Sequence, residues 1–207
     1  MLIRELMTDI HQNAIDHGWW DDVRKLAEII ALIHSEWSEA LEEARAGRPM
    51  VWYDPASGDH ECGGGGLCDS YIEFGICHGN NGHCPDHHKP EGVAVELIDG
   101  CIRILDFAGS YALQMSVDDK SVENVEDLYI STVETDIPEL IADLHNFTSL
   151  AYDAFCNDMI EEGWIWIVET LIKALSWVKA QGLDPLALLL EKHAYNKTRP
   201  YKHGKQF

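Results

Sequence analysis

Apolar residues recur every three or four positions along most of the chain, which is the spacing of one face of an α-helix. Gly, Pro or Asp residues mark most ends of these periodic segments. Because the β-branched residues fall at the same helical spacing and do not alternate, the pattern predicts an all-α helical bundle. We expect helices over residues 2–17, 23–46, 92–115, 138–162, 164–181 and 185–196.

Several expected helix ends carry residues with known capping roles. Gly18 follows the first helix, as expected of a glycine that adopts a left-handed conformation just past a helix end. Either Asp21 or Asp22 is expected to cap the second helix. Asp184 is expected to cap the last helix, with Pro185 in its first turn.

Residues 51–90 interrupt the helical pattern between the second and third helices. This stretch is rich in Gly, Cys and His and has no sustained period, so we interpret residues 1–207 as one all-α domain with a loop insertion at 51–90. The insertion lacks a C-x-x-C pair, so a loop without metal is the alternative to a structural zinc site. The candidate zinc ligands are Cys62, Cys68, Cys77 and Cys84.

The chain is strongly acidic, with 15 Lys and Arg residues against 36 Asp and Glu residues and a formal net charge of −21. This excess argues against a protein that binds nucleic acid by neutralising its phosphates. A bound anion would need a divalent cation between it and the carboxylates. No apolar run reaches the ~18 residues of a membrane span and no signal peptide is evident, so we expect a cytoplasmic protein without a membrane partner.

The second and fourth expected helices contain similar sequences, IIALIHSEWSEA at 29–40 and LIADLHNFTSLA at 140–151. This alignment pairs His34 with His145 and puts Phe147 in the place of a glutamate. The third and fifth helices also match, through VELIDGCIRIL and VETLIKALSWV. The second half would then be a duplicate that lost its carboxylates, although short amphipathic helices also resemble one another by chance.

Two pairs of acidic residues lie beside apolar stripes of consecutive helices. Glu36 and Glu39 continue a face of the second helix that is apolar one turn earlier. Glu96 and Asp99 have the same spacing on the third helix. If the two helices pack antiparallel, the four carboxylates converge and suit Mg²⁺, a hard cation that takes oxygen ligands. The alternative is that they are surface acids of amphipathic helices.

These two pairs resemble the E-x-x-E and E-x-x-D motifs of the MazG-like, all-α nucleoside triphosphate pyrophosphohydrolases. The segments ELIDGCIRILDFAG and EKHAYNKTRPYKHGKQF are also similar to members of that family. The resemblance covers the chain except the insertion and the acidic connection at about 116–136. It implies the helical bundle of the all-α NTP pyrophosphatase type.

The resemblance also implies a chemistry for Glu36, Glu39, Glu96 and Asp99. As catalytic residues they would bind Mg²⁺, with Mn²⁺ as an alternative ion, and the metal would contact the triphosphate and help to activate a water molecule. Attack at the α-phosphorus would release pyrophosphate and leave a nucleoside monophosphate. One carboxylate could act as general base, and the sequence does not say which.

Five further positions are candidate substrate contacts. Relatives that act on pyrimidine nucleotides place a His and a Trp where His11 and Trp20 fall, and these side chains can bind a base, although Trp20 could equally anchor the helix junction. In the basic tail, Lys192, Asn196 and Arg199 are candidate triphosphate contacts. The alternative is that the tail balances an acidic body or meets another subunit.

We therefore expect a Mg²⁺-dependent hydrolase of a canonical or modified (d)NTP that prefers pyrimidines and acts in nucleotide-pool control. The alternative is a non-enzymatic metal-binding or protein-interaction module that uses the Cys/His insertion. Family members commonly build their sites from bundles that span subunits, which implies a homo-oligomer, a dimer or a tetramer. An internal duplicate could instead complete the bundle within one chain.

Overall fold

The computed structural model describes residues 1–54, 89–112, 124–128 and 135–204. It confirms the all-α class, because helices account for most of the described residues. The helices are α1 (Ile3–Asp16), α2 (Leu26–Arg45), α4 (Val93–Ala112), α5 (Ile137–Cys156), α6 (Ile160–Ala180) and α7 (Pro185–Lys197). Two 3₁₀ turns cover Val125–Asp127 and Tyr201–Gly204.

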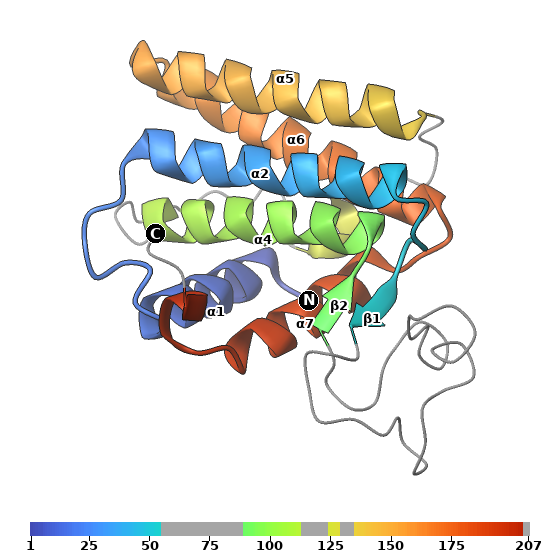
Figure 1. Cartoon of the computed structure of the whole chain (residues 1–207). Helices are drawn as coiled ribbons and strands as arrows, with labels where there is room; N and C mark the ends of the chain where they lie inside the picture. The colour runs from blue at the N-terminus through green and yellow to red at the C-terminus, as the bar shows by residue number, and fades with distance from the viewer. Residues whose placement is uncertain (55–88, 113–123, 129–134, 205–207) are drawn as a thin grey trace.

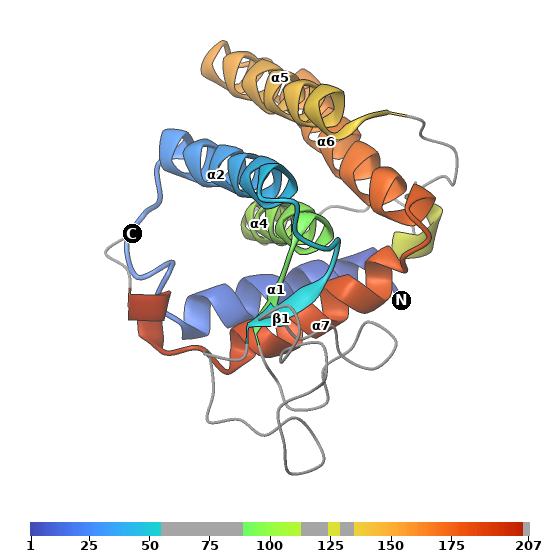
Figure 2. The ribbon, with the colours of Figure 1, turned by 45° about the vertical axis from the view of Figure 1, so that its right-hand side comes forward.

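Helix α4 is at the centre of the molecule. Figure 1 shows α2 and α4 running side by side in opposite directions, with α5 and α6 on one side of this pair and α1 and α7 on the other. Turning the molecule shows that α1 and α7 cross the long helices at a steep angle (Figure 2). Helix α4 packs against α1, α2, α6 and α7. Its residues therefore face several neighbours, which suits a helix that carries a site.

A short two-stranded ribbon joins α2 to α4, and the sequence pattern did not predict it. Strands β1 (Trp52–Asp54) and β2 (Lys89–Glu91) pair antiparallel over three residues each. Three residues are too few for an alternating pattern to be recognised. The two strands lie at the two ends of the expected insertion at 51–90, which is therefore not a loop over its whole length. The four candidate zinc ligands lie outside the described residues; they are Cys62, Cys68, Cys77 and Cys84.

The expected cap of α2 is wrong. The helix begins at Leu26, and the preceding Lys25 makes no side-chain capping bond. Asp21 instead accepts a hydrogen bond from the Tyr201 hydroxyl, so it ties the C-terminal segment to the α1–α2 connection. The expected capping of α7 is confirmed, because Asp184 accepts from the backbone N–H groups of the first turn.

The break between α5 and α6 falls at residues 157–159, earlier than the expected break at 163. Gly163 lies inside α6, where a Cβ atom would come within 2.5 Å of the Phe155 ring. The glycine therefore gives room to an aromatic side chain and does not end a helix. Asp158, with φ at 60°, makes the turn in its place.

The α5–α6 hairpin packs against α2 and α4. The residues that the internal sequence match pairs are in contact: His34 Nδ1 is 2.7 Å from His145 Nδ1, and Trp37 Nε1 donates to Thr148 Oγ1 at 3.1 Å. Contacts between equivalent residues are typical of a two-fold interface. The α2 and α5 helices also run in opposite directions (Figure 1), as helices related by a two-fold axis perpendicular to them do. That the second half is an internal duplicate stays a prediction.

None of the helices in the described part of the chain combines the length and the apolarity needed to cross a membrane.

Candidate active site

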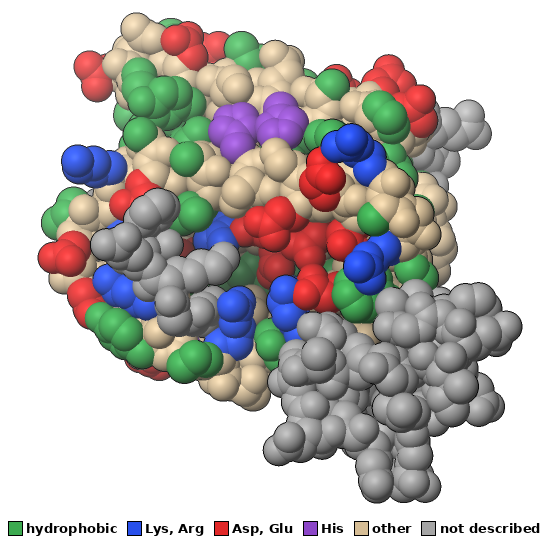
Figure 3. All heavy atoms as spheres, in the orientation of Figure 1, with side chains coloured by type: hydrophobic (Ala, Val, Ile, Leu, Met, Phe, Trp, Pro, Cys, Tyr) green, Lys and Arg blue, Asp and Glu red, His purple; other side chains and the backbone are tan. Residues whose placement is uncertain are grey.

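Three glutamates from α2 and α4 meet on one face of the bundle. One carboxylate oxygen of each of Glu36, Glu39 and Glu96 lies within 4.8 Å of the others. The antiparallel packing of α2 against α4 brings them together, because each helix presents its acid pair to the other. Figure 3 shows acidic side chains gathered at the centre of this face, below the paired histidines.

The burial of two of these glutamates is unusual for acidic side chains. Glu36 and Glu96 are each only 4% exposed, whereas Glu39 is exposed to solvent. Burial, with a further contribution from the charge of Asp99, raises the pKa of Glu96 to about 10. Burial also raises the pKa of Glu36, and the nearby Arg103 only partly opposes this. A cation at this position would stabilise the ionised form of both side chains.

Asp99, the fourth predicted ligand, is paired with a lysine and does not join the three glutamates. Lys192 Nζ lies 2.9 Å from Asp99 Oδ2 and also donates to the Pro90 backbone oxygen at 2.9 Å. The lysine is only 1% exposed. Burial lowers its pKa, but the charges of Asp99 and Glu96 outweigh this effect and the pKa is raised. Lys192 is therefore a buried cation at the edge of the acid cluster.

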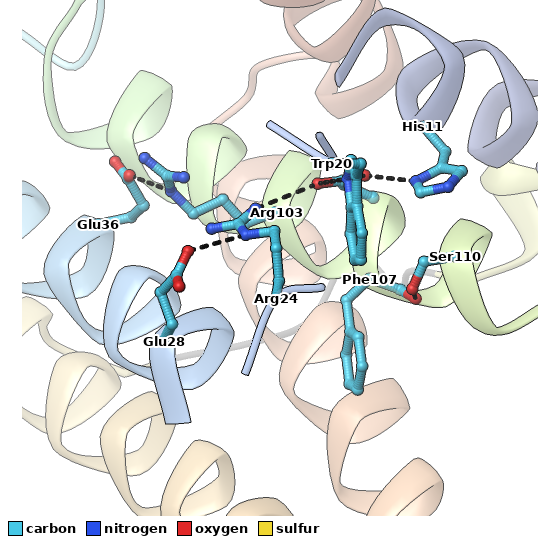
Figure 4. A network of polar contacts seen from close by, with 9 residues as sticks. His11, Trp20, Arg24, Glu28, Glu36, Arg103, Phe107 and Ser110 are labelled. Carbon is cyan, nitrogen blue, oxygen red and sulfur yellow. Dashed lines mark hydrogen bonds and ion pairs between the residues drawn. The ribbon is translucent and has the colours of Figure 1, made fainter. Parts of the chain in front are cut away.

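Arg103 is a functional candidate that the sequence interpretation did not assign. It lies one turn beyond Asp99 on α4 and forms an ion pair with Glu36 (Figure 4). The sequence does place Arg103 on the same helix line as the acids. Its pairing depends on how α2 packs against α4, and spacing along one helix does not reveal that.

Asp106 connects the two predicted base contacts. Its carboxylate lies 2.7 Å from His11 Nδ1 and accepts from Trp20 Nε1 at 3.0 Å. Arg24 Nη1 lies 3.8 Å from the other carboxylate oxygen. His11, Trp20 and Arg24 approach one another from the α1 side of α4 (Figure 4). Asp106 and Arg24 are further site residues that the sequence interpretation did not assign.

A cavity extends from the acids toward α1 and α7. This cavity is partly open to solvent. Its wall includes Trp19 but neither His11 nor Trp20, which lie behind it and hold Asp106. Asn196 and Arg199 line it as predicted substrate contacts would. The polar and charged lining residues are Asn13, Arg24, Glu36, Asp99, Arg103, Asp106, His193, Asn196 and Arg199.

Comparisons of the chain with models of known protein families, with curated proteins and with solved structures find no match.

Proposed function

We propose that this protein is a Mg²⁺-dependent nucleoside triphosphate pyrophosphohydrolase that converts a (d)NTP to the monophosphate and pyrophosphate. The observation that carries the proposal is the meeting of Glu36, Glu39 and Glu96 beside a cavity whose lining includes three arginines. Buried carboxyl groups ionise at neutral pH only beside a cation, and a triphosphate needs cations. A divalent ion between them satisfies both.

The donor set fits Mg²⁺ in chemistry and in size. All three candidate ligands are carboxylates, which are the hard oxygen donors that this ion prefers. Opposite ligands of an octahedral Mg²⁺ lie roughly 4.2 Å apart, given bonds of about 2.1 Å. The carboxylate oxygens lie within 4.8 Å of one another, so small side-chain rotations would bring them into range. When bound, Mg²⁺ would neutralise phosphate charge and lower the pKa of a coordinated water.

The residues around the acids would neutralise and bind the phosphates. Lys192 and Arg103 supply positive charge beside Asp99 and Glu36. Arg199 and Asn196 line the cavity and would contact phosphate oxygens. Water forms a new bond to the α-phosphorus, the bond to the β-phosphate oxygen breaks, and a site carboxylate accepts the proton of the water.

The test is a broad panel of ribo- and deoxynucleoside triphosphates incubated with the purified protein and Mg²⁺. Separated products should include a monophosphate and pyrophosphate, with pyrimidine nucleotides among the better substrates. Glu39→Gln and Asp99→Asn should each lower kcat by about 100-fold or more. Glu42→Gln is the matched control, because Glu42 lies on the same helix, is exposed and pairs with Arg45. Full activity in both site variants would overturn the assignment.

A further inference from the structure

Three side chains of the cavity wall carry a buried polar atom that has no hydrogen-bond partner among the described residues. These atoms are Arg24 Nη2, His193 Nδ1 and the Asn196 side-chain oxygen. The Arg24 and His193 side chains are only 8% and 4% exposed. Leaving a buried polar atom unpaired is costly. Several such atoms around one cavity therefore indicate a ligand that pairs with them.

Two of the three guanidinium nitrogens of Arg24 lie near carboxylates, and the third, Nη2, has no hydrogen-bond partner among the described residues. Its Nε donates to Glu28 Oε1 at 2.9 Å, and its Nη1 lies 3.8 Å from Asp106 Oδ2. The guanidinium also lies over the rings of Trp19 and Trp20, with centroids 5.9 and 5.5 Å away. Figure 4 shows Arg24 between Glu28 and Trp20. A guanidinium only donates hydrogen bonds, so the missing partner of Nη2 is an acceptor.

His193 offers the complementary chemistry. Its Nε2 donates to Asp9 Oδ2 at 2.9 Å, and burial lowers the pKa of the ring, which is therefore neutral near pH 7. A neutral imidazole that donates from Nε2 presents a lone pair at Nδ1. The missing partner of Nδ1 is thus a donor, such as a hydroxyl group.

The position of Arg24 relative to the acids suits the base of a nucleotide. Arg24 approaches α4 at Asp106, seven residues beyond Asp99, which corresponds to about 10 Å along the helix axis. An extended nucleotide with its phosphates at the acids would carry its base to this level. The Trp19 ring in the cavity wall supplies an aromatic surface there.

Building on the proposed hydrolysis of (d)NTPs, we propose that Arg24 Nη2 donates to a carbonyl oxygen of the nucleobase and that His193 Nδ1 accepts from a sugar hydroxyl. Uracil, thymine, cytosine and guanine each have a carbonyl oxygen. Adenine has no carbonyl oxygen, and its acceptors are ring nitrogens that do not extend beyond the ring as an exocyclic oxygen does, so they pair less well with an Nη2 placed for a carbonyl oxygen. The cavity therefore selects against adenine nucleotides.

The test compares kcat/KM for the best carbonyl-bearing dNTP with kcat/KM for dATP. The wild-type protein should favour the first by at least 10-fold. Arg24→Met should lower kcat/KM for that nucleotide by about 10- to 100-fold and for dATP by less than about threefold. Arg24→Lys, which keeps a donor, should retain part of the preference. Glu28→Gln is the control, because it changes a partner of Arg24 but leaves Nη2 in place.

The sugar contact has its own comparison. The 2′,3′-dideoxy form of the best nucleotide should be a poorer substrate of the wild-type protein by about 10-fold. His193→Phe should narrow this difference to less than about threefold. If His193→Phe lowers kcat/KM equally for the nucleotide and for its 2′,3′-dideoxy form, the role of His193 is overturned.

Failure of this inference is distinguishable from failure of the proposed function. If hydrolysis occurs but dATP is the best substrate, or Arg24→Met lowers both activities equally, the role of Arg24 is overturned and the hydrolase remains. If no nucleotide is hydrolysed, the proposed function fails. Calorimetric binding of UMP, CMP, GMP and AMP then tests Arg24 alone, and equal binding by wild type and Arg24→Met overturns its role.

Discussion

Glu96 is the residue whose ionisation most directly reports on the acid cluster. It is almost fully buried, and its carboxyl group lies beside Glu36 and Glu39 on one side and Asp99 on its own helix. The pKa of about 10 means that, without a cation, the side chain keeps its proton at neutral pH. Metal binding would have to displace that proton.

This raised pKa predicts how stability depends on pH. In the unfolded chain Glu96 ionises near its ordinary value of 4.5, whereas the folded protein holds the proton up to about pH 10. The stability that the protonated group provides is therefore complete below pH 4.5 and is lost as the pH rises toward 10. In EDTA, the free energy of unfolding of wild type minus that of Glu96→Gln should fall between pH 5 and 8 by up to about 1.4 kcal/mol per pH unit.

The measurement is urea unfolding of both proteins at four pH values, with and without Mg²⁺. The subtraction removes the effects of other titrating groups, such as the buried His193. Mg²⁺ should reduce the fall for wild type, because it stabilises the ionised glutamate. A difference that stays constant with pH in EDTA would contradict the raised pKa.

A second prediction at the residue scale concerns Asp106 and the free energy of unfolding. Its carboxylate holds His11 and Trp20 and faces the Arg24 guanidinium. Asp106→Asn removes the negative charge and turns an N–H donor toward groups that also donate. Urea unfolding should show a loss of about 1.5–3 kcal/mol in the free energy of unfolding.

Asp16→Asn provides the comparison for Asp106. Asp16 is exposed and near the end of α1, where it accepts from Gln12. Its substitution should change the free energy of unfolding by less than about 0.5 kcal/mol. Equal stability of Asp106→Asn and wild type would show that this carboxylate is not a structural anchor of the α1 side.

At the scale of elements, the close approach of α2 and α4 depends on Gly100. A Cβ atom at this position would lie 2.1 Å from the six-membered part of the Trp37 ring, which is completely buried. Gly100→Ala should therefore force the helices apart and lower the free energy of unfolding by about 1–3 kcal/mol. Because the acid cluster joins α2 to α4, the same change should also disturb it.

A double-mutant cycle tests whether the clash with the Trp37 ring causes this loss of stability. In a Trp37→Leu background the ring is absent, so Gly100→Ala should cost much less than it does in the wild-type protein. Urea unfolding of the four proteins gives the interaction energy. An unchanged cost in both backgrounds would mean that Gly100 acts through its backbone alone and not through the space it leaves for Trp37.

Helix periodicity predicted which elements form, but tertiary contacts decided several of their ends. The spacing of Glu36, Glu39 and Glu96 beside apolar stripes was enough to predict that they share a site. Nothing in the spacing distinguishes the paired Asp99 from the three clustered glutamates, because its lysine comes from α7. The sequence likewise could not predict a role for Arg24, because its unpaired nitrogen depends on how the helices around the cavity pack.

At the scale of the whole molecule, the α5–α6 hairpin packs against α2 and α4, the two helices that carry the acids. The His34–His145 and Trp37–Thr148 contacts join equivalent residues of the two halves. The second half carries apolar residues where the first carries its glutamates, so it supports the site without repeating it. Because α2 and α4 bring the acids together within one chain, we expect the site to need no second subunit, even if the protein associates into a dimer or tetramer.

Mixing two inactive variants tests whether the site lies within one chain. Glu39 comes from α2 and Asp99 from α4, and in this structure both belong to the same site of the same chain. Glu39→Gln mixed with Asp99→Asn should therefore show no more nucleotide hydrolysis than the two variants measured separately.

If sites formed between subunits, random pairing would combine two intact halves in a fraction of the assemblies and restore up to about a quarter of the wild-type activity per site. The mixture should be unfolded and refolded together, so that slow subunit exchange does not hide such a result, and refolded wild type gives the reference activity. Recovered activity would mean that the bundle exchanges helices between chains and that α5–α6 is not its permanent partner.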